Sequence, residues 1–275
     1  MSEVNIPAIP DLGARSDEIT IYAGPCSVES VEQFDEVAAC IKELGLTWIR
    51  GGAFKPRTNP HSFQGLGEEA LKIMADAGEK YGLKTLTEVM DSAHCEMVHS
   101  YVDGLQVGAR NFQNFSLLKK IGHVTRDSHK MVLYKRGFAG SIAEWLAACD
   151  YVTAEGNENI VLCERGIRTF ETATRFTLDI AAVPVVHKQS LFPICVDVSH
   201  PAGQRDLVPS LAYAAVAAGA DSIMIEVHPN PPVAKSDGPQ QLTPAQFETL
   251  VGDLRAIAAV FGTKIVEREV TLLCK

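Results

Sequence analysis

The feature that most constrains the fold is a regular alternation of short apolar runs with longer amphipathic segments. Eight runs rich in β-branched residues follow one another along the chain and are predicted to be strands. They read ITIYAG, LTWIRG, LKTLTEV, DGLQVG, KMVLYK, NIVLCE, PICVDV and DSIMIEV. Because strands that alternate with helices pair in parallel through right-handed crossovers, the sequence predicts a parallel α/β sheet with helices outside it.

The segments between these runs carry apolar residues at helical spacing, and they are predicted to be helices. The clearest of them read EQFDEVAACIKELG, EEALKIMADAGEKYG, SIAEWLAACD, TFETATRFTLDIAA and DLVPSLAYAAVAAG. A final helix is predicted over TPAQFETLVGDLRAIAAVFG. Its apolar face would consist of Phe247, Leu250, Val251, Leu254, Ile257, Ala258 and Phe261.

Eight units favour a closed (β/α)₈ TIM barrel over an open doubly wound sheet. The units are evenly spaced, and no G-x-G-x-x-G motif follows the first strand. The chain has 275 residues, the usual size of one such barrel, and no linker divides it. We therefore expect a single α/β domain, with an N-terminal arm over residues 1–18 and the barrel over residues 19–275.

Composition indicates the cellular compartment and argues against some classes of binding partner. The N-terminus has no basic-then-apolar leader pattern, no stretch is apolar for long enough to cross a membrane, and the seven cysteines are scattered. These features predict a cytoplasmic protein with reduced thiols. A formal net charge of −9 argues against nucleic acid or an anionic membrane as a partner.

Basic residues nevertheless collect where the predicted strands end. The loop RGGAFKPRTNPHSFQGLG follows the second strand, and the active site of a TIM barrel lies at the carboxyl ends of its strands. Each basic residue alone could belong to a surface ion pair. Together they predict a ring that binds anionic small molecules, because Arg and Lys are the usual partners of phosphate and carboxylate. The ring comprises Arg50, Lys55, Arg57, Arg110, Lys135 and Arg165.

Four further strand-end residues could bind a divalent metal ion. Cys26 follows the first strand, His200 follows the seventh, Glu226 ends the eighth, and Asp237 lies in the loop after it. A thiolate, an imidazole and two carboxylates suit Mn²⁺, Fe²⁺, Co²⁺ or Zn²⁺. The alternative is that Cys26 is a small core residue, since the separations along the chain carry no specific signal.

Several motifs give the chain a family resemblance. They are AGPCSVES, Lys-Pro-Arg-Thr at 55–58, QVGARNFQNFSLL, LYKRGFAGSIAEWLAA, NIVLCERGIRTFE, VDVSHPAGQRDLVP and IMIEVHPNPPVAKSDGPQQLT. With them the chain resembles the 3-deoxy-D-arabino-heptulosonate-7-phosphate synthases, in particular the short β-subgroup of the type I enzymes. The resemblance implies condensation of phosphoenolpyruvate with erythrose 4-phosphate and release of phosphate. This is the first step of the shikimate pathway, which supplies chorismate and the aromatic amino acids.

The resemblance also implies roles for individual residues. A divalent metal, with Mn²⁺ favoured over Co²⁺, Fe²⁺ or Zn²⁺, would be bound by Cys26, His200, Glu226 and Asp237. Phosphoenolpyruvate would be bound by Arg50, Lys55, Ala109, Arg110, Lys135 and Arg165. Erythrose 4-phosphate would be bound by Lys55, Pro56, Arg57 and Thr58. The catalytic residues would be Lys55, Glu88, Cys26 and His200, with Glu88 near the place where water must be oriented.

The chain departs from the family pattern in two respects. Asn59 stands where the family commonly has Ser, which bears on the geometry of the erythrose phosphate pocket. Because the arm before the barrel is short, we expect neither the built-in regulatory domain that many relatives carry nor a chorismate mutase segment, and hence no feedback inhibition through a built-in domain. We therefore expect a separate chorismate mutase as a partner. The apolar outer faces of the helices, the N-terminal arm and the family resemblance together predict a homo-oligomer, a dimer or a tetramer.

Three alternatives stay open at this point. The first is the sister enzyme that makes 3-deoxy-manno-octulosonate 8-phosphate from arabinose 5-phosphate. That enzyme usually carries a Lys-Ala-Asn-Arg-Ser type of sequence in place of Lys-Pro-Arg-Thr. The second is a sialic acid synthase, which uses related chemistry. The third belongs to another class, a non-catalytic protein that binds a phosphorylated metabolite.

Overall fold

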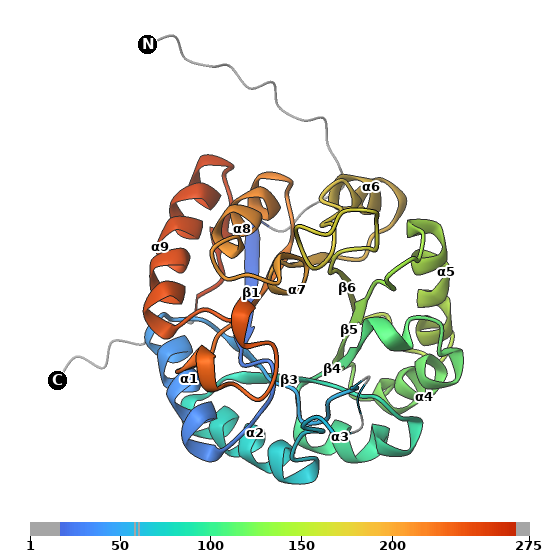
Figure 1. Cartoon of the computed structure of the whole chain (residues 1–275). Helices are drawn as coiled ribbons and strands as arrows, with labels where there is room; N and C mark the ends of the chain where they lie inside the picture. The colour runs from blue at the N-terminus through green and yellow to red at the C-terminus, as the bar shows by residue number, and fades with distance from the viewer. Residues whose placement is uncertain (1–16, 58, 60, 268–275) are drawn as a thin grey trace, which may run out of the picture.

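Eight parallel strands close into a barrel in the computed structural model, which describes residues 17–57, 59 and 61–267 (Figure 1). The strands are β1 (Glu18–Gly24), β2 (Trp48–Arg50), β3 (Lys84–Glu88), β4 (Gly104–Val107), β5 (Met131–Lys135), β6 (Ile160–Glu164), β7 (Ile194–Asp197) and β8 (Ser222–Glu226). Each pairs with its neighbours in sequence, and pairing of β1 with both β2 and β8 closes the ring. All eight predicted runs contain a strand, and the TIM barrel is confirmed.

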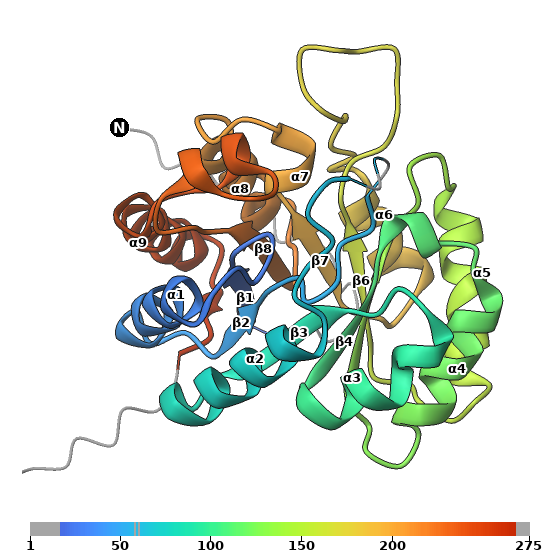
Figure 2. The same ribbon diagram turned by 60° about the horizontal axis from the view of Figure 1, so that its bottom comes forward.

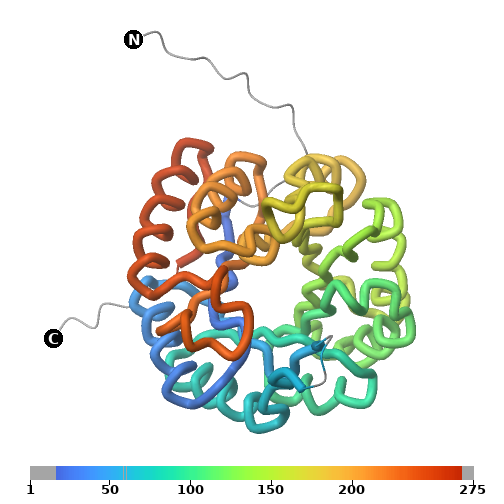
Figure 3. The backbone as a smooth tube through the Cα atoms, viewed as in Figure 1, coloured from blue at the N-terminus to red at the C-terminus, as the bar shows by residue number. Residues whose placement is uncertain are grey.

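Helices surround the barrel on its outside, except for the short α7, which lies at the rim where the strands end (Figures 1 and 3). They are α1 (Val31–Glu43), α2 (Glu68–Tyr81), α3 (Cys95–Tyr101), α4 (Phe115–Thr125), α5 (Ile142–Thr153), α6 (Ala182–Gln189), α7 (Ser199–Ala202), α8 (Val208–Ala217) and α9 (Pro244–Val260). Capping boxes begin α5 at Ser141 and α9 at Thr243. In each, a hydroxyl and a side-chain carbonyl or carboxylate satisfy amide groups that the first turn leaves without partners.

The apolar face of α9 is confirmed except at its end. Phe247, Leu250, Val251, Leu254 and Ala258 are buried, and Ile257 is partly buried against the core. Phe261 was predicted to lie on the same face, but it is 48% exposed. The helix ends at Val260, so Phe261 is the residue that follows the last turn and no longer points to the barrel.

One predicted helix is wrong. Residues 169–182 were expected to be helical, yet α6 begins only at Ala182. Residues 165–181 instead form a projection that stands above the barrel, which we call the β6 hairpin (Figure 2, yellow). Ile167 and Thr177 pair in antiparallel fashion at its base, and the hydroxyls of Thr169 and Thr177 lie 2.6 Å apart. Threonine favours this outcome, because its hydroxyl competes for local hydrogen bonds and its β-branching disfavours helix.

Two layers of core hold the barrel together. Outward-facing strand residues pack against the helices, whereas a second cluster fills the interior of the barrel. The interior cluster consists of Tyr22, Leu86, Met131, Leu133, Val161, Cys163, Cys195 and Met224, with Trp48 packed against it. The barrel is therefore a filled core, and any ligand must bind above this cluster.

Two features at the ends of the chain complete the description. A two-residue strand, β9 (Lys264–Ile265), pairs with the start of β1, which the sequence did not predict. Residues 1–16 of the predicted arm lie outside the described residues, and β1 begins at Glu18. No helix within the described ranges is both long and apolar enough to cross a membrane.

Candidate active site

The functional rim is a direct continuation of the rows of side chains that fill the barrel. Because side chains alternate along a strand, residues two positions apart point the same way. Two positions after the interior residues Trp48, Leu86, Leu133, Cys163, Cys195 and Met224, the chain carries Arg50, Glu88, Lys135, Arg165, Asp197 and Glu226. Along each of these six strands, the inward-facing residue is apolar within the barrel and the next inward-facing residue is charged. The six charged residues form the floor of the site.

A cavity of about 330 Å³ opens above this floor, a size that suits a small molecule. Its described walls contain seven cations and two carboxylates, so it is positive although the chain is acidic. The cations are Arg50, Lys55, Arg57, Arg110, Lys135, Arg165 and Arg175. Pro56, Asn59, Glu88, Ala109, His200 and Asp237 also line it. Thr58 lies outside the described residues.

Two cations on the floor are held by buried carboxylates. Lys135 Nζ lies 2.6 Å from Asp197 Oδ2, and Arg50 Nη1 lies 3.4 Å from Glu226 Oε1. Burial by itself disfavours the charged form of Lys135, but the Asp197 carboxylate raises the pKa of this lysine above its usual value. Arg50 also donates to the carbonyl oxygen of Pro25 at 2.7 Å. Both side chains are therefore charged and fixed before any ligand arrives.

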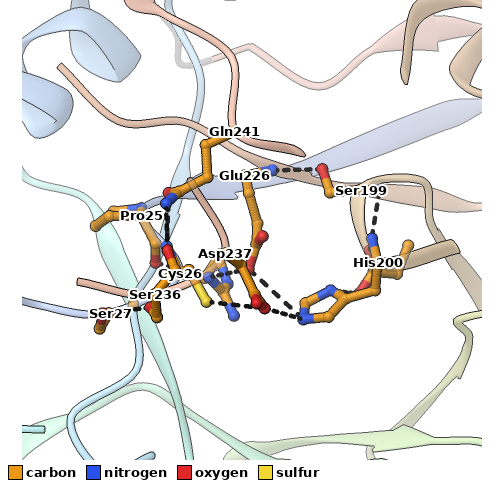
Figure 4. Close-up of polar contacts among 12 residues, drawn as sticks. Pro25, Cys26, Ser27, Ser199, His200, Glu226, Ser236, Asp237 and Gln241 are labelled. Carbon is orange, nitrogen blue, oxygen red and sulfur yellow. Dashed lines mark hydrogen bonds and ion pairs between the residues drawn. The ribbon is translucent and has the colours of Figure 1, made fainter. Parts of the chain in front are cut away.

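Three of the four predicted metal ligands converge at one side of the cavity (Figure 4). The ligand atoms of Cys26, Glu226 and Asp237 all lie within 4.8 Å of one another. Cys26 Sγ lies 3.5 Å from Asp237 Oδ2. Cys26 and Glu226 are fully buried, and Asp237 lines the cavity. One thiol and two carboxylates so close together are the donors that a divalent ion of intermediate softness requires.

His200 lies next to this cluster. Its Nε2 atom is 3.6 Å from Glu226 Oε1 and 3.8 Å from Asp237 Oδ2. Its Nδ1 atom lies 2.7 Å from Asp197 Oδ2, which orients the ring so that Nε2 faces the two carboxylates. Burial lowers the pKa of His200, which favours the neutral imidazole that a metal ligand must be. Cys26, Glu226 and Asp237 could therefore hold a divalent metal ion, and His200 lies beside them with its Nε2 atom facing the two carboxylates.

Lys55 connects the basic loop to this cluster. Its Nζ atom lies 3.0 Å from Cys26 Sγ and 2.9 Å from the carbonyl oxygen of Cys26. Burial raises the pKa of the Cys26 thiol to about 12, although the nearby ammonium group favours the thiolate. Only a bound cation would overcome this burial, since a coordinated thiol loses its proton. Burial therefore favours the protonated thiol at Cys26 unless a metal ion is bound beside it.

Buried amides that the sequence interpretation missed support the cluster from behind. Gln240 Nε2 donates to Glu226 Oε2 at 2.6 Å, and Gln241 Oε1 accepts from the amide of Cys26 at 2.9 Å. Asp237, just before them, has a φ of 47°, in the left-handed region that is uncommon for non-glycine residues. The consecutive glutamines Gln240 and Gln241 form no recognisable functional motif, so only the folded structure reveals these contacts.

Arg175 is a third residue that was not predicted. It projects from the β6 hairpin, and its Nη1 atom lies 3.2 Å from Asp237 Oδ2 and 2.9 Å from Gln240 Oε1. This ion pair is partly exposed to solvent, because the Arg175 side chain is 37% exposed. The segment around Arg175 was expected to be helical, so no pattern in the sequence indicated that this arginine reaches the cavity.

Glu88 stands at the end of β3 and lines the cavity. Its Oε2 atom accepts from Gln106 Nε2 at 3.2 Å, whereas its Oε1 atom is buried without a hydrogen-bond partner. A carboxylate oxygen in such a place requires a proton donor from a ligand or from water. The geometry thus makes Glu88 available as a base or as a residue that orients water.

Comparison with known proteins identifies the family to which the chain is similar. The model of the DAHP synthetase I family matches residues 12–258. The chain is 50% identical over 255 residues to phospho-2-dehydro-3-deoxyheptonate aldolase of Thermotoga maritima, covering 93% of this chain and 74% of that protein. It is 33% identical over 264 residues to 2-dehydro-3-deoxyphosphooctonate aldolase of Caulobacter vibrioides, covering 87% of this chain and 88% of that protein.

Solved structures give the same picture. The crystal structure of the Thermotoga maritima aldolase superimposes with a TM-score of 0.87 at 50% identity, covering 91% of this chain and 72% of that one. A truncated form of 3-deoxy-D-arabino-heptulosonate 7-phosphate synthase from the same organism superimposes with a TM-score of 0.84 at 46% identity, covering 91% of this chain and 90% of that one. Similarity thus extends over nearly the whole barrel.

Proposed function

This chain belongs to the DAHP synthetase I family, and we propose on that basis that it condenses phosphoenolpyruvate with erythrose 4-phosphate. The products are 3-deoxy-D-arabino-heptulosonate 7-phosphate and inorganic phosphate. The observation that carries the proposal is a cavity lined by seven cations beside the cluster of Cys26, Glu226 and Asp237. The cations suit two anionic substrates, and the cluster suits one divalent ion.

The cations hold together two substrates that repel each other. Neutralising and orienting both anions turns an encounter in water into a reaction between fixed neighbours, which is a large part of catalysis in such reactions. Phosphoenolpyruvate would be bound on the floor and at the end of β4, by Arg50, Lys55, Ala109, Arg110, Lys135 and Arg165. Erythrose 4-phosphate would be bound by the basic loop, through Lys55, Pro56, Arg57 and Thr58.

A divalent metal ion would be bound by Cys26, His200, Glu226 and Asp237, and Mn²⁺ is our first choice. When bound, such an ion supplies Lewis acidity that stabilises the negative charge developing on the aldehyde oxygen. Arg50 and Gln240 hold the two oxygens of Glu226, and Lys55 lies against Cys26. These contacts would keep the donors in place when the ion exchanges.

We propose that Glu88 acts in the second half of the reaction. Once the methylene carbon of phosphoenolpyruvate has bonded to the aldehyde carbon, positive charge develops at the carbon that carries the phosphate. Water attacks this carbon and passes one proton to the Glu88 carboxylate. The hydroxyl group that remains on the carbon becomes the ketone carbonyl as phosphate leaves with the electrons of the C–O bond. Its proton and the proton held by Glu88 pass to the departing phosphate and to the new alkoxide. The position of Glu88 in the wall of the cavity supports this role.

The related synthesis of the octulosonate phosphate is disfavoured. Relatives named for that activity share about a third of their residues with this chain, against half for the heptonate aldolase. The sequence Lys-Pro-Arg-Thr at 55–58 points the same way. A non-catalytic protein that binds a phosphorylated metabolite would need none of the metal donors, and all four are present.

The test follows the ultraviolet absorbance of phosphoenolpyruvate. The purified protein is given erythrose 4-phosphate or arabinose 5-phosphate, each with Mn²⁺ and with an excess of chelator. We expect consumption with erythrose 4-phosphate and Mn²⁺, and loss of it with chelator. Consumption with arabinose 5-phosphate alone would assign the octulosonate reaction, and no consumption with either sugar would contradict the proposed enzyme.

A further inference from the structure

Arg165 differs from the other buried cations that line the cavity. Lys135 is paired with Asp197 and Arg50 with Glu226. Among the described residues, no carboxylate pairs with Arg165. Its side chain is nearly buried, and its Nη1 atom has no hydrogen-bond partner. A buried guanidinium group without a counterion is costly, so other contacts must offset its desolvation.

Two aromatic rings supply these contacts. The Cζ atom of Arg165 lies 4.2 Å from the ring centroid of Phe176 and 4.9 Å from that of Phe138. The two rings stack on each other, with centroids 5.2 Å apart and an angle of 8° between their planes. We call Phe138 and Phe176 the aromatic pair. The face of an aromatic ring carries negative charge density and attracts a cation, and guanidinium groups stack especially well.

The aromatic pair stabilises the cation in a way that a carboxylate does not. A carboxylate would accept hydrogen bonds from the N–H groups of Arg165 and cancel its charge, so a ligand would have to displace it. A ring face accepts no such in-plane hydrogen bonds. Arg165 lines the cavity, so its unused N–H donors stay available to a ligand that binds there, and its positive charge is not neutralised.

Backbone contacts from two loops fix the rings. Phe138 follows β5, and its carbonyl oxygen accepts from the amide of Arg168 at 2.8 Å. Phe176 belongs to the β6 hairpin, and its amide donates to the carbonyl oxygen of Pro201 at 3.1 Å. Gly166, at the base of the hairpin, has a φ of 86°, and a Cβ atom there would lie 2.7 Å from the Cβ of Phe176. The hairpin is thus shaped so that Phe176 reaches Arg165.

We infer that Phe138 and Phe176 are positioning residues that keep Arg165 charged, unpaired and directed at an oxyanion of phosphoenolpyruvate. The inference rests on the proposed function, in which Arg165 binds this substrate. It adds two aromatic side chains to the determinants of substrate affinity, although neither of them can donate a hydrogen bond. It also assigns a structural role to the β6 hairpin, which positions Phe176 at the floor of the site.

Direct binding of phosphoenolpyruvate, measured by calorimetry with Mn²⁺ and without aldose phosphate, tests the inference without turnover. Each of Phe138→Leu and Phe176→Leu should raise the Kd for phosphoenolpyruvate by about 3- to 10-fold, from the usual strength of a cation–π contact. Phe176→Tyr keeps a ring face and should stay within about 2-fold of the original Kd. Phe170→Leu is the matched control, because Phe170 is 98% exposed on the same hairpin.

Steady-state kinetics separate a positioning role from a general loss of structure. The leucine variants should raise KM for phosphoenolpyruvate and leave KM for erythrose 4-phosphate within about 2-fold, because the basic loop is untouched. A series that preserves shape guards against misfolding. Replacing Phe176 with mono-, di- and trifluorophenylalanine withdraws charge from the ring face, so the Kd should rise with each fluorine.

The outcomes distinguish this inference from the proposed function. If the original chain binds phosphoenolpyruvate and the leucine and fluorinated variants bind it equally well, the aromatic pair has no such role and the proposed function stands. If the original chain does not bind phosphoenolpyruvate, both are overturned. A rise in Kd that follows fluorine content, with the Phe170→Leu control unchanged, supports the inference.

Discussion

Gly108 leaves the space that the Glu88 carboxylate occupies. A Cβ atom at Gly108 would lie 2.0 Å from Glu88 Oε1 and 2.5 Å from its Cδ atom. The backbone of Gly108 has φ −71° and ψ 158°, an extended conformation that any residue can adopt. The glycine is therefore required by the neighbouring side chain and not by its own backbone.

Gly108→Ala should consequently remove the base without unfolding the barrel. The added methyl group forces the Glu88 carboxylate out of its place, and kcat should fall by at least about 100-fold, as for loss of a general base. Glu88→Gln should give a similar loss. Thermal melting should show that the variant remains folded.

Gly252→Ala is the matched control for this substitution. Gly252 lies in α9, and nothing approaches a Cβ atom there within 4 Å. This variant should keep its full kcat and gain about 0.5–1 kcal/mol of stability, as helix interiors do when alanine replaces glycine. Full activity of Gly108→Ala would show that the reaction does not need Glu88 where the structure places it.

Cys26→Ala should abolish metal-dependent turnover. The thiol is one of three donors that lie within 4.8 Å of one another, so its loss should weaken Mn²⁺ binding by at least about 100-fold. Competition with a coloured chelator measures this affinity independently of activity. Cys40→Ala, a half-buried position on α1, should change neither quantity. Full turnover by Cys26→Ala in excess chelator would contradict the assignment of Cys26 as a metal ligand.

Arg57→Ala should affect one substrate far more than the other. Arg57 lies in the basic loop that lines the cavity, and an arginine that binds a phosphate contributes about 10- to 100-fold in affinity. KM for erythrose 4-phosphate should rise by this factor, whereas KM for phosphoenolpyruvate should stay within about 2-fold. Arg110→Ala should show the reverse pattern. Equal effects on both substrates would mean that the two anion sites are misplaced.

Arg136→Leu should lower stability in a manner that depends on pH. Arg136 Nη1 lies 2.9 Å from Glu164 Oε2 and 2.7 Å from Asp179 Oδ2, and Glu164 is fully buried. Without the arginine, the Glu164 carboxylate is buried and unpaired, which should cost about 3–5 kcal/mol of the free energy of unfolding at pH 8. Urea unfolding measures this loss.

The sign of the pH dependence follows from the pKa of Glu164. Burial already raises this pKa in the native chain, and removal of Arg136 takes away the nearby charge that lowers it. The folded variant therefore binds a proton more tightly than the unfolded one, so its stability falls as pH rises through the pKa of folded Glu164. The loss should be smaller at pH 5 than at pH 8. Adding Glu164→Gln should remove this pH dependence, and a loss that stays constant with pH would contradict the explanation.

The sequence predicted the barrel and most of its rim because both follow from periodicity. Leu133 and Lys135, for example, are two positions apart in one predicted strand, so their side chains point to the same side of the sheet. Leu133 packs in the barrel interior and Lys135 lines the cavity. The contact of Arg175 with Asp237 joins two irregular loops and has no such periodicity. Thr177 and its neighbours resembled a helix because the apolar spacing over 169–182 is helical, whereas the threonines favour the hairpin. The identity of the metal, self-association and a separate chorismate mutase stay predictions.

Within a strand, an interior residue and the rim residue two positions later depend on the same register, so a strand cannot change its length. Loops that do not set this register can. Deleting one residue inside β5 would point Lys135 toward the helices and leave the interior cluster without Leu133. Packing and chemistry would fail together. Inserting residues at the exposed tip of the β6 hairpin, around Phe170, would disturb neither, provided that Phe176 still reaches Arg165. Tolerance to insertion should therefore rise sharply from the strands to the hairpin tip, which makes that tip the natural place to graft a peptide tag or an additional binding module onto this enzyme.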